Sequence, residues 1–264
     1  MAKQPQKTEH NVALITGAAQ RIGKAIALNM ADHGWDIALH YNTSANAAEK
    51  VVTEIQKKGQ KAVAIRGNLS SQDDVASLIP QCVKNLGTPT CLINNASLFK
   101  NDDIENLTSE RWQAHIDTNL RAPVFLAQAF SNTLKKKKKG NIINIIDQRV
   151  WRLTPLFISY TIAKSGLWTA TQTLAQALAP NIRVNAIGPG PVLQSVHQSK
   201  DQFAKQAEAT LLERSTDPKE IAAAVDFIIN TPSMTGQMLA LDNGQHLAWQ
   251  TPDIIGVEGE QAKA

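Results

Sequence analysis

Cysteines, aromatic residues and long apolar runs are all scarce in this sequence, and each scarcity excludes a class of protein. The 264 residues include two cysteines, Cys82 and Cys91, too few for a disulfide scaffold and without metal-ligand spacing. We interpret both as small buried apolar side chains. No apolar run approaches the roughly 18 residues of a membrane span, and residues 1–10 lack the apolar core of a secretory signal. The sequence thus predicts a cytoplasmic protein with no membrane partner.

A general excess of charge is also missing, although the pI is near 9.0. Residues 135–139 are five consecutive lysines, and removing their charges from the net charge of +4 leaves −1. Aromatic residues form 5% of the chain, and none interleaves with these lysines as in proteins that stack on single-stranded nucleic acid. A solvated loop is the favoured interpretation of the run, and we predict no nucleic-acid partner.

Strand-like and helix-like stretches alternate along the whole chain. Hydrophobic residues make up 43% of it, enough for a sizeable core. The pattern predicts strands at 12–16, 36–40, 62–66, 91–94, 141–146, 182–187 and 238–241, and helices at 21–33, 46–58, 73–85, 110–134, 159–178 and 218–229. We expect the longest helix to bend near Pro123. Apolar strands that alternate with helices are typical of a parallel sheet covered on both faces.

This pattern predicts an α/β protein built on a single Rossmann-type doubly wound parallel sheet. We expect one domain over residues 11–247, with a substrate loop at about 191–215, between a flexible arm at 1–10 and a tail at 248–264. The segment 194–213 is either a mobile lid over substrate or an ordinary surface helix. Ligands of such sheets bind beyond the carboxyl ends of the strands, so the segments that follow the predicted strands are the candidate site.

A glycine-rich segment, 16–23, joins the first predicted strand to the first helix. Gly17 permits a tight turn, and Gly23 lets the helix begin close to the sheet, with Arg21 and Ile22 between them. The free N–H groups of such a helix N-terminus suit a pyrophosphate. A plain strand–helix turn is an equal alternative for this segment taken alone.

No acidic residue follows the second predicted strand, which ends with His40, Tyr41, Asn42 and Ser44 nearby. A site specific for NAD usually places Asp or Glu here to bind the ribose 2′-hydroxyl. Arg21, in the glycine-rich segment, could instead pair with a 2′-phosphate. Both charge choices favour NADPH, against the alternative of a polar loop with a surface arginine.

Two further segments carry polar side chains that suit a cofactor and a proton transfer. Asn95, Ala96 and Ser97 follow the fourth predicted strand, where small and amide side chains allow a cofactor to approach, although a turn alone is the simpler explanation. Tyr160 and Lys164 lie one turn apart on a helix. The ammonium is expected to lower the pKa of Tyr160, so that the phenol can protonate a substrate as hydride arrives. The same spacing is common on helix surfaces.

Together and in this order, the four segments resemble the short-chain dehydrogenase/reductase family over nearly the whole chain. Asn119, in the long predicted helix, matches the family's active-site asparagine, and Pro189 and Gly190 match its segment near the nicotinamide. By the same resemblance Asn68 and Leu69 are expected near the adenine, with Asn68 in place of an aspartate.

One departure from the family pattern narrows the resemblance. The family's usual catalytic serine, after the fifth strand, is replaced by Asp147. With Arg21 and Phe99, this resembles the pteridine reductases and the neighbouring bacterial dihydromonapterin reductases. The resemblance implies hydride transfer from NADPH to a pterin or dihydropterin, often also to folate, by a homotetramer. Phe99 would stack on the pterin, while Tyr160 would donate a proton with Asp147 as its partner. If buried, Asp147 should have a raised pKa.

The expected substrate site also includes Ser97, Trp151 and Leu193. Trp151, with Arg149 and Arg152, either lines the pocket and contacts an acidic tail such as the glutamate of folate, or is a packing tryptophan beside solvated arginines. The six histidines are scattered along the chain. They show no metal pattern, so we expect no metal ion and assign them to the polar surface or the cofactor shell.

Three functions remain open at this stage. The first is an NADPH-dependent pterin reductase, the second a reductase of another carbonyl or imine, and the third a non-catalytic NADPH-binding sensor. Asp147 in the place of serine argues against a simple carbonyl reductase. Tyr160, Lys164 and Asn119 argue against a sensor, because a sensor has no need of them.

Overall fold

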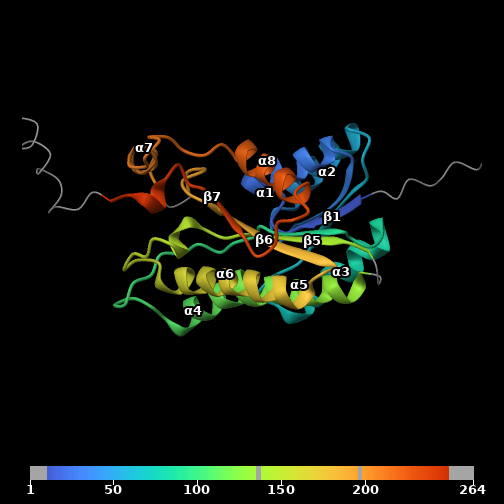
Figure 1. The fold of residues 1–264 in the computed structure, drawn as a ribbon, viewed down its shortest axis with the longest axis horizontal. Coiled ribbons are helices and arrows are strands. Elements are labelled where there is room, and N and C mark those ends of the chain that lie inside the picture. The colour runs from blue at the N-terminus through green and yellow to red at the C-terminus, as the bar shows by residue number, and fades with distance from the viewer. Residues whose placement is uncertain (1–10, 135–137, 196–197, 250–264) are drawn as a thin grey trace, which may run out of the picture.

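A parallel sheet of seven strands runs through the protein (Figure 1). The computed structural model describes residues 11–134, 138–195 and 198–249. The strand order is β3-β2-β1-β4-β5-β6-β7. The strands are β1 Asn11–Ile15, β2 Trp35–Tyr41, β3 Ala62–Arg66, β4 Cys91–Asn94, β5 Gly140–Ile145, β6 Ile182–Pro189 and β7 Met238–Leu241. This confirms the doubly wound α/β fold. The predicted arm at 1–10, most of the tail and lysines 135–137 lie outside the described residues.

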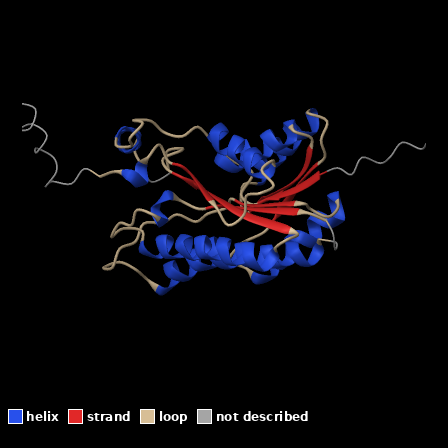
Figure 2. Cartoon of the chain, viewed as in Figure 1, coloured by secondary structure: helices blue, strands red, loops and turns tan. Residues whose placement is uncertain are grey.

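Helices cover both faces of the sheet (Figures 1 and 2). One face carries α1 Arg21–Asp32, α2 Ala45–Lys57 and α8 Pro218–Ile229. The other carries α3 Gln72–Leu86, α4 Ser109–Ile116, α5 Ala122–Thr133 and α6 Ile158–Leu178. α7, Lys200–Glu208, lies beyond the end of the sheet, within the segment predicted as a lid or a surface helix. Burial on both faces explains why the strands are apolar without alternation.

The predicted helix over 110–134 is interrupted. α4 ends at Ile116, and Asp117–Arg121 forms a π-helical turn before α5 begins at Ala122. Pro123 has no N–H and cannot donate to the carbonyl of Asn119, four residues earlier, so the regular α-helical ladder cannot continue through this point. The change of helical form therefore precedes the proline, and Asn119 lies within it. Such π-turns often accompany functional residues.

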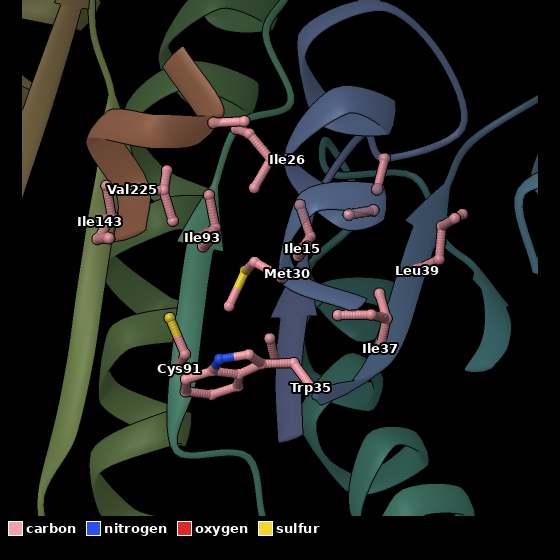
Figure 3. Close-up of a cluster of buried hydrophobic side chains, with 14 of the residues drawn as sticks. Ile15, Ile26, Met30, Trp35, Ile37, Leu39, Cys91, Ile93, Ile143 and Val225 are labelled. Carbon is pink, nitrogen blue, oxygen red and sulfur yellow. The ribbon is translucent and has the colours of Figure 1, made fainter. Parts of the chain in front are cut away.

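The apolar stripe of α1 forms the centre of one core layer. Ile26 and Met30 are fully buried and belong to one cluster with Ile15 of β1, and Figure 3 shows Met30 among the side chains of the sheet. Each such burial contributes roughly 1.5–3 kcal/mol. Cys82 and Cys91 are buried in the two main core clusters, and burial raises the pKa of both thiols to about 12. Their interpretation as packing residues is confirmed.

The turn between β1 and α1 leaves no room for an added side chain. A β-carbon on Gly23 would lie 2.3 Å from the carbonyl oxygen of Gly17 and 2.5 Å from Nδ2 of Asn95. Gly17 has a φ of +64°, which favours glycine. The helices that follow β1 and β4 cover opposite faces of the sheet. The turn therefore lies where the strand order reverses, which is the usual ligand-binding crevice of this architecture.

Replacement of Gly23 by alanine should destabilise the protein through this contact. We expect Gly23→Ala to lose about 1–3 kcal/mol of unfolding free energy, because backbone atoms must shift to admit the methyl group. The matched control is Gly59→Ala, where no atom lies within 4 Å of the added carbon and only a φ of +89° is unfavourable. It should cost about 1 kcal/mol. Urea unfolding measures both, and a loss for Gly23→Ala no larger than the control's would contradict this account.

Candidate active site

The turns that follow β1 and β4 are hydrogen-bonded to each other. Nδ2 of Asn95 donates to the carbonyl oxygens of Thr16 at 2.9 Å and Gly17 at 3.1 Å. Oγ1 of Thr16 accepts the N–H groups of Asn95 and Ala96, each at 3.0 Å. Gln20, the N-cap of α1, makes no side-chain cap. The first N–H groups of α1 are therefore left for a ligand.

His40 supports this turn from within the protein. Its Nδ1 accepts the N–H of Gly17 at 3.1 Å, and Nε2, which then carries the proton, donates to the carbonyl of Gly67 at 3.0 Å. Burial lowers the pKa of His40, because desolvation disfavours the imidazolium. The ring is thus neutral at neutral pH. This predicted cofactor residue lies behind the binding surface and fixes the turn that forms it.

A cleft of about 340 Å³ opens at the ends of β1 and β2. None of the described residues that line it is acidic, and the first turns of α1 and α2 hold no acidic residue either. Both helix N-termini therefore keep the partial positive charge that attracts phosphate. The predicted cofactor residues on its walls are Gly17, Arg21, Ile22, Gly23, Tyr41, Asn42, Ser44, Asn95, Ala96 and Ser97. This donor set fits the phosphates of a dinucleotide, including a 2′-phosphate.

Arg21 joins this cleft to the loop after β6. Its backbone has a φ of +55°, and its guanidinium donates to the carbonyl oxygens of Leu193 and Gln194, each at 2.8 Å. Arg21 also lines both this cleft and a larger one beside it. The guanidinium that the sequence assigns to a 2′-phosphate is therefore bound to the predicted substrate loop in this structure.

The larger cleft, about 1030 Å³, extends across the ends of β4, β5 and β6. Gln202, Phe203 and Gln206 of α7 form one of its walls. The predicted site residues that line it are Arg21, Ile22, Asn95, Ser97, Phe99, Asp147, Tyr160, Lys164, Pro189, Gly190 and Leu193. Besides His40, the predicted residues that line neither cleft are Asn68, Leu69, Asn119 and Trp151.

Three of these residues lie away from the clefts. Leu69 is buried in the core layer under α3 and α5, and Asn68 is exposed at the start of the loop after β3. Trp151 is 43% exposed, and its ring contacts those of Trp168 and His246. The packing interpretation of Trp151 is the one that this geometry supports.

The half-buried Asp147 forms a polar centre with the buried Tyr160 and Lys164 at the end of β5. The Tyr160 hydroxyl donates to Oδ2 of Asp147 at 2.9 Å. Nζ of Lys164 donates to the carbonyl of Ile145 at 2.8 Å and lies 5.8 Å from the centre of the Tyr160 ring. The side chains predicted to carry the chemistry therefore meet in the larger cleft.

Burial governs the protonation of this centre. It raises the pKa of Asp147, as expected, against the opposing N–H and charge of Arg149. It also raises the pKa of Tyr160 well above 10, and the adjacent Asp147 carboxylate adds to the effect. The expected lowering of the Tyr160 pKa is therefore wrong here, because burial and Asp147 raise this pKa more than Arg149 and Ser97 lower it. Burial lowers the pKa of Lys164 itself to about 8.

The side chain of Asn119 binds the backbone of the loop after β4. Its Oδ1 accepts the N–H of Leu98 and its Nδ2 donates to the carbonyl of the same residue, both at 2.8 Å. Ser97 Oγ donates to the same Oδ1 at 3.3 Å. The fully buried asparagine thus positions the loop that carries Ser97 and Phe99. It lines no cleft itself.

Phe99 forms an aromatic pair with Phe157, which sequence analysis did not predict. Its ring stacks on Phe157, with centroids 4.5 Å apart and planes 10° from parallel, and meets Tyr160 edge-on at 4.7 Å. Arg149 lies over the Phe157 ring at 4.8 Å. Phe157 has a φ of +61° as the N-cap of α6, a conformation that no local pattern predicts for phenylalanine. Phe99 is 36% exposed, which leaves aromatic surface for a flat ligand.

A second set of residues missed by the sequence lies beneath Phe99 and Tyr160. Asp102, His115 and Ser159 are fully buried. Nε2 of His115 accepts the N–H of Lys100 at 3.2 Å, so Nδ1 carries the proton and donates to Ser159 Oγ at 2.6 Å. Ser159 in turn donates to Asp102 through a short hydrogen bond. This series of hydrogen bonds joins α4, α6 and the loop after β4. The assignment of His115 to the polar surface or cofactor shell is wrong.

Two general findings concern metals and membranes. No group of three or more metal-ligating side chains gathers within the described part of the chain. None of the helices described for residues 11–249 is long and apolar enough to cross a membrane.

The fold and the two clefts together define an oxidoreductase of the dinucleotide-binding type. The chain belongs to the short chain dehydrogenase family, whose model matches residues 11–205.

Curated relatives and solved structures differ in what their names report. The chain is 34% identical over 241 residues to 3-oxoacyl-[acyl-carrier-protein] reductase of Synechocystis sp., covering 88% of this chain and 96% of that protein. It is 45% identical to the structure of FolM alternative dihydrofolate reductase 1 from Brucella suis in complex with NADP, with a TM-score of 0.90, covering 93% of this chain and 98% of that one. A metagenomic blue fluorescent protein in complex with NADPH is 28% identical, with a TM-score of 0.84, over 89% of this chain and 97% of that one.

The lowered pKa of Lys164 sets an alkaline limit for activity. A rise in pH through about 8 removes the ammonium, so kcat/KM should fall above this pH by about tenfold per pH unit. Lys164→Arg, which stays charged, should retain less activity but lose this limb. Initial rates between about pH 6 and pH 10 measure both profiles. A flat profile across pH 8 in the unmodified protein would be incompatible with a catalytic ammonium at Lys164.

Proposed function

We propose that this protein is an NADPH-dependent reductase of a pterin or dihydropterin, dihydrofolate included. The observation that carries the proposal is the hydrogen bond between Tyr160 and Asp147 at 2.9 Å, beside the exposed edge of the Phe99–Phe157 pair. A carboxyl group replaces the serine that the family pattern places after β5. The resemblance to pteridine reductases supports the same reaction, as does the similarity to the Brucella structures, which are described as alternative dihydrofolate reductases.

The smaller cleft supports NADPH as the cofactor. Gly17 and Gly23 line this cleft at the N-terminus of α1, whose free N–H groups can bind the pyrophosphate. Tyr41, Asn42 and Ser44 offer polar groups without the carboxylate that would repel a 2′-phosphate. Bound NADPH supplies the hydride. NADP or NADPH is present in the similar solved structures.

A pterin is flat and rich in ring nitrogens, and the larger cleft supplies matching groups. Phe99 offers an aromatic face for stacking. Asp147 and Tyr160 are adjacent to it, so they can hydrogen-bond to ring nitrogens. A plain ketone has no ring to stack on Phe99 and offers a single acceptor atom to Tyr160. We therefore expect the site to bind a ketone less tightly than a pterin.

The proton is delivered by Tyr160 at its phenolic oxygen. Its raised pKa keeps the phenol protonated until a basic nitrogen develops on the reduced substrate. Asp147 accepts the hydrogen bond of the phenol and orients it. Because burial also raises the pKa of Asp147, this carboxylate can take a proton from solvent and pass it to the Tyr160 phenolate that remains after the transfer. Lys164 stabilises the charge that remains on the pair.

Reduction of a 3-oxoacyl thioester is the second candidate, because the curated relatives carry that name. The pair of Asp147 and Tyr160 favours the pterin reaction over it. Assembly as a homotetramer and a cytoplasmic location stay predictions from the sequence and its resemblance.

A substrate panel tests the proposed function. Purified protein should oxidise NADPH with dihydrobiopterin or dihydrofolate, more slowly with NADH, and weakly or not at all with a 3-oxoacyl thioester or a simple ketone. Absorbance at the reduced nicotinamide band measures each rate. Turnover with the thioester or the ketone alone would overturn the pterin assignment in favour of the second candidate.

Substitution of the catalytic pair tests the proton path. Tyr160→Phe should lower kcat for dihydropterin by about 10²–10⁴-fold, while NADPH affinity, followed by fluorescence titration, stays close to that of the unmodified protein. Asp147→Ser restores the commoner family residue and should lose pterin turnover as well. An Asp147→Ser variant with full pterin activity would remove this carboxyl from the mechanism.

A further inference from the structure

We propose that Lys100, Arg111 and Arg149 form a subsite, here called the cationic rim, that binds the carboxylates of a substrate tail. The ligand class is a pterin that carries an anionic benzoylglutamate tail, as dihydrofolate does. The rim would make the enzyme select such substrates over pterins with short neutral side chains. This inference rests on the proposed function and names the substrate within it.

The charge of the larger cleft is strongly one-sided. Among its described lining residues, Asp147 is the one carboxylate, whereas the cations are Arg21, Lys100, Arg111, Arg149 and Lys164. Two of these cations belong to other parts of the site, Arg21 to the turn after β1 and Lys164 to the centre that contains Asp147 and Tyr160. Arg21 binds the loop after β6, and Lys164 binds the carbonyl of Ile145. The remaining three are the cationic rim.

The three rim residues surround the aromatic pair. Lys100 follows Phe99 directly in the chain, so their α-carbons are about 3.8 Å apart. Arg149 lies 4.8 Å from the centre of the Phe157 ring, which stacks on Phe99. Arg111 extends from α4 to the carbonyl of Asn101 at 3.1 Å. A ring stacked on Phe99 would therefore carry its side chain past these charges.

None of the three rim cations forms an ion pair with a carboxylate among the described residues. No described group accepts a hydrogen bond from Nζ of Lys100. The bonds of Arg111 go to oxygens of Asn101 and Asn106. Arg149 donates to Thr154 at 2.9 Å, while its buried Nε has no partner in the described structure. Arg111 and Arg149 are half-buried and not neutralised, which favours an anionic ligand because desolvation strengthens the attraction, and the exposed Lys100 adds its charge to the same cleft.

The rim fits a small tail better than an acidic carrier protein, the other anionic partner that the relatives' names raise. Arg111 and Arg149 are half-buried within the cleft that holds Phe99. A carrier protein would meet cations on the outer surface, whereas these are reached by a group that has entered the cleft. Rigid forks such as guanidinium also match carboxylates in geometry.

The experiment compares KM for two substrates that share a ring and differ in the tail. Dihydrofolate and dihydrobiopterin are assayed with NADPH, using Lys100→Gln, Arg111→Gln and the double variant. Each single substitution should raise the ratio of KM for dihydrofolate to KM for dihydrobiopterin by about two- to fivefold. The double variant should raise it by about tenfold, and added salt should weaken dihydrofolate binding selectively. Lys84→Gln, near the end of α3, is the matched control and should leave the ratio unchanged.

The outcomes separate this inference from the function on which it rests. An unchanged ratio in an active double variant would overturn the rim while leaving pterin reduction intact. An equal rise of both KM values would also overturn it, because the residues would then act on the ring or the loop. Wild-type protein inactive with both pterins would overturn the proposed function and the rim together. Variants that weaken only a carrier-linked 3-oxoacyl substrate would assign the rim to the carrier protein.

Discussion

The close contact between the turns after β1 and β4 is the constraint on which the site depends. Gly23 and Gly17 meet there without room for a β-carbon, and Asn95 of the turn after β4 donates to the carbonyl oxygens of Thr16 and Gly17 in the turn after β1. This contact exposes the N-terminus of α1 to one cleft. It also sets where the chain leaves β4 towards Ser97 and Phe99. The proposed phosphate-binding and stacking ends of the site are therefore joined by one set of hydrogen bonds between side chains and backbone, so a shift in either turn moves both.

Desolvation by burial, more than the neighbouring charges, sets the direction of the pKa shifts of Asp147, Tyr160 and Lys164. Tyr160 and Lys164 are buried beside the half-buried Asp147, and desolvation favours the neutral form of each. Neighbouring hydrogen bonds and charges oppose the raised pKa of Asp147, whereas at Tyr160 the neighbouring carboxylate adds to the rise. The result is a phenol that keeps its proton beside a carboxyl of raised pKa. A serine in place of Asp147 could hydrogen-bond to the phenol but could not titrate at neutral pH, which is the physical basis for proposing a different reaction here.

The fold and the glycine-rich turn could be predicted because they follow from local patterns, whereas Phe99, Pro189 and Gly190 were predicted from the family resemblance. Apolar runs located the strands, and parallel strands necessarily bring their carboxyl ends to one edge. The sequence did not predict Phe157, whose positive φ contradicts its local preference, or the buried chain of Asp102, His115 and Ser159, whose members are 13 to 57 positions apart. Such contacts exist only after distant segments fold together. The predicted direction of the Tyr160 pKa shift was wrong for a related reason, since the spacing of Tyr160 and Lys164 along a helix carries no information about burial.

Arg21 has a consequence for the order of events at the site. Its guanidinium lines the smaller cleft while it holds the carbonyl groups of Leu193 and Gln194. A phosphate that draws this group away removes two hydrogen bonds from the substrate loop, and a loop that retains it withholds a cation from the phosphate. Occupancy of the nucleotide cleft and the conformation of the loop are thus thermodynamically linked, and the linkage acts equally in both directions. Arg21 is the side chain through which this linkage would act, because it lines both clefts.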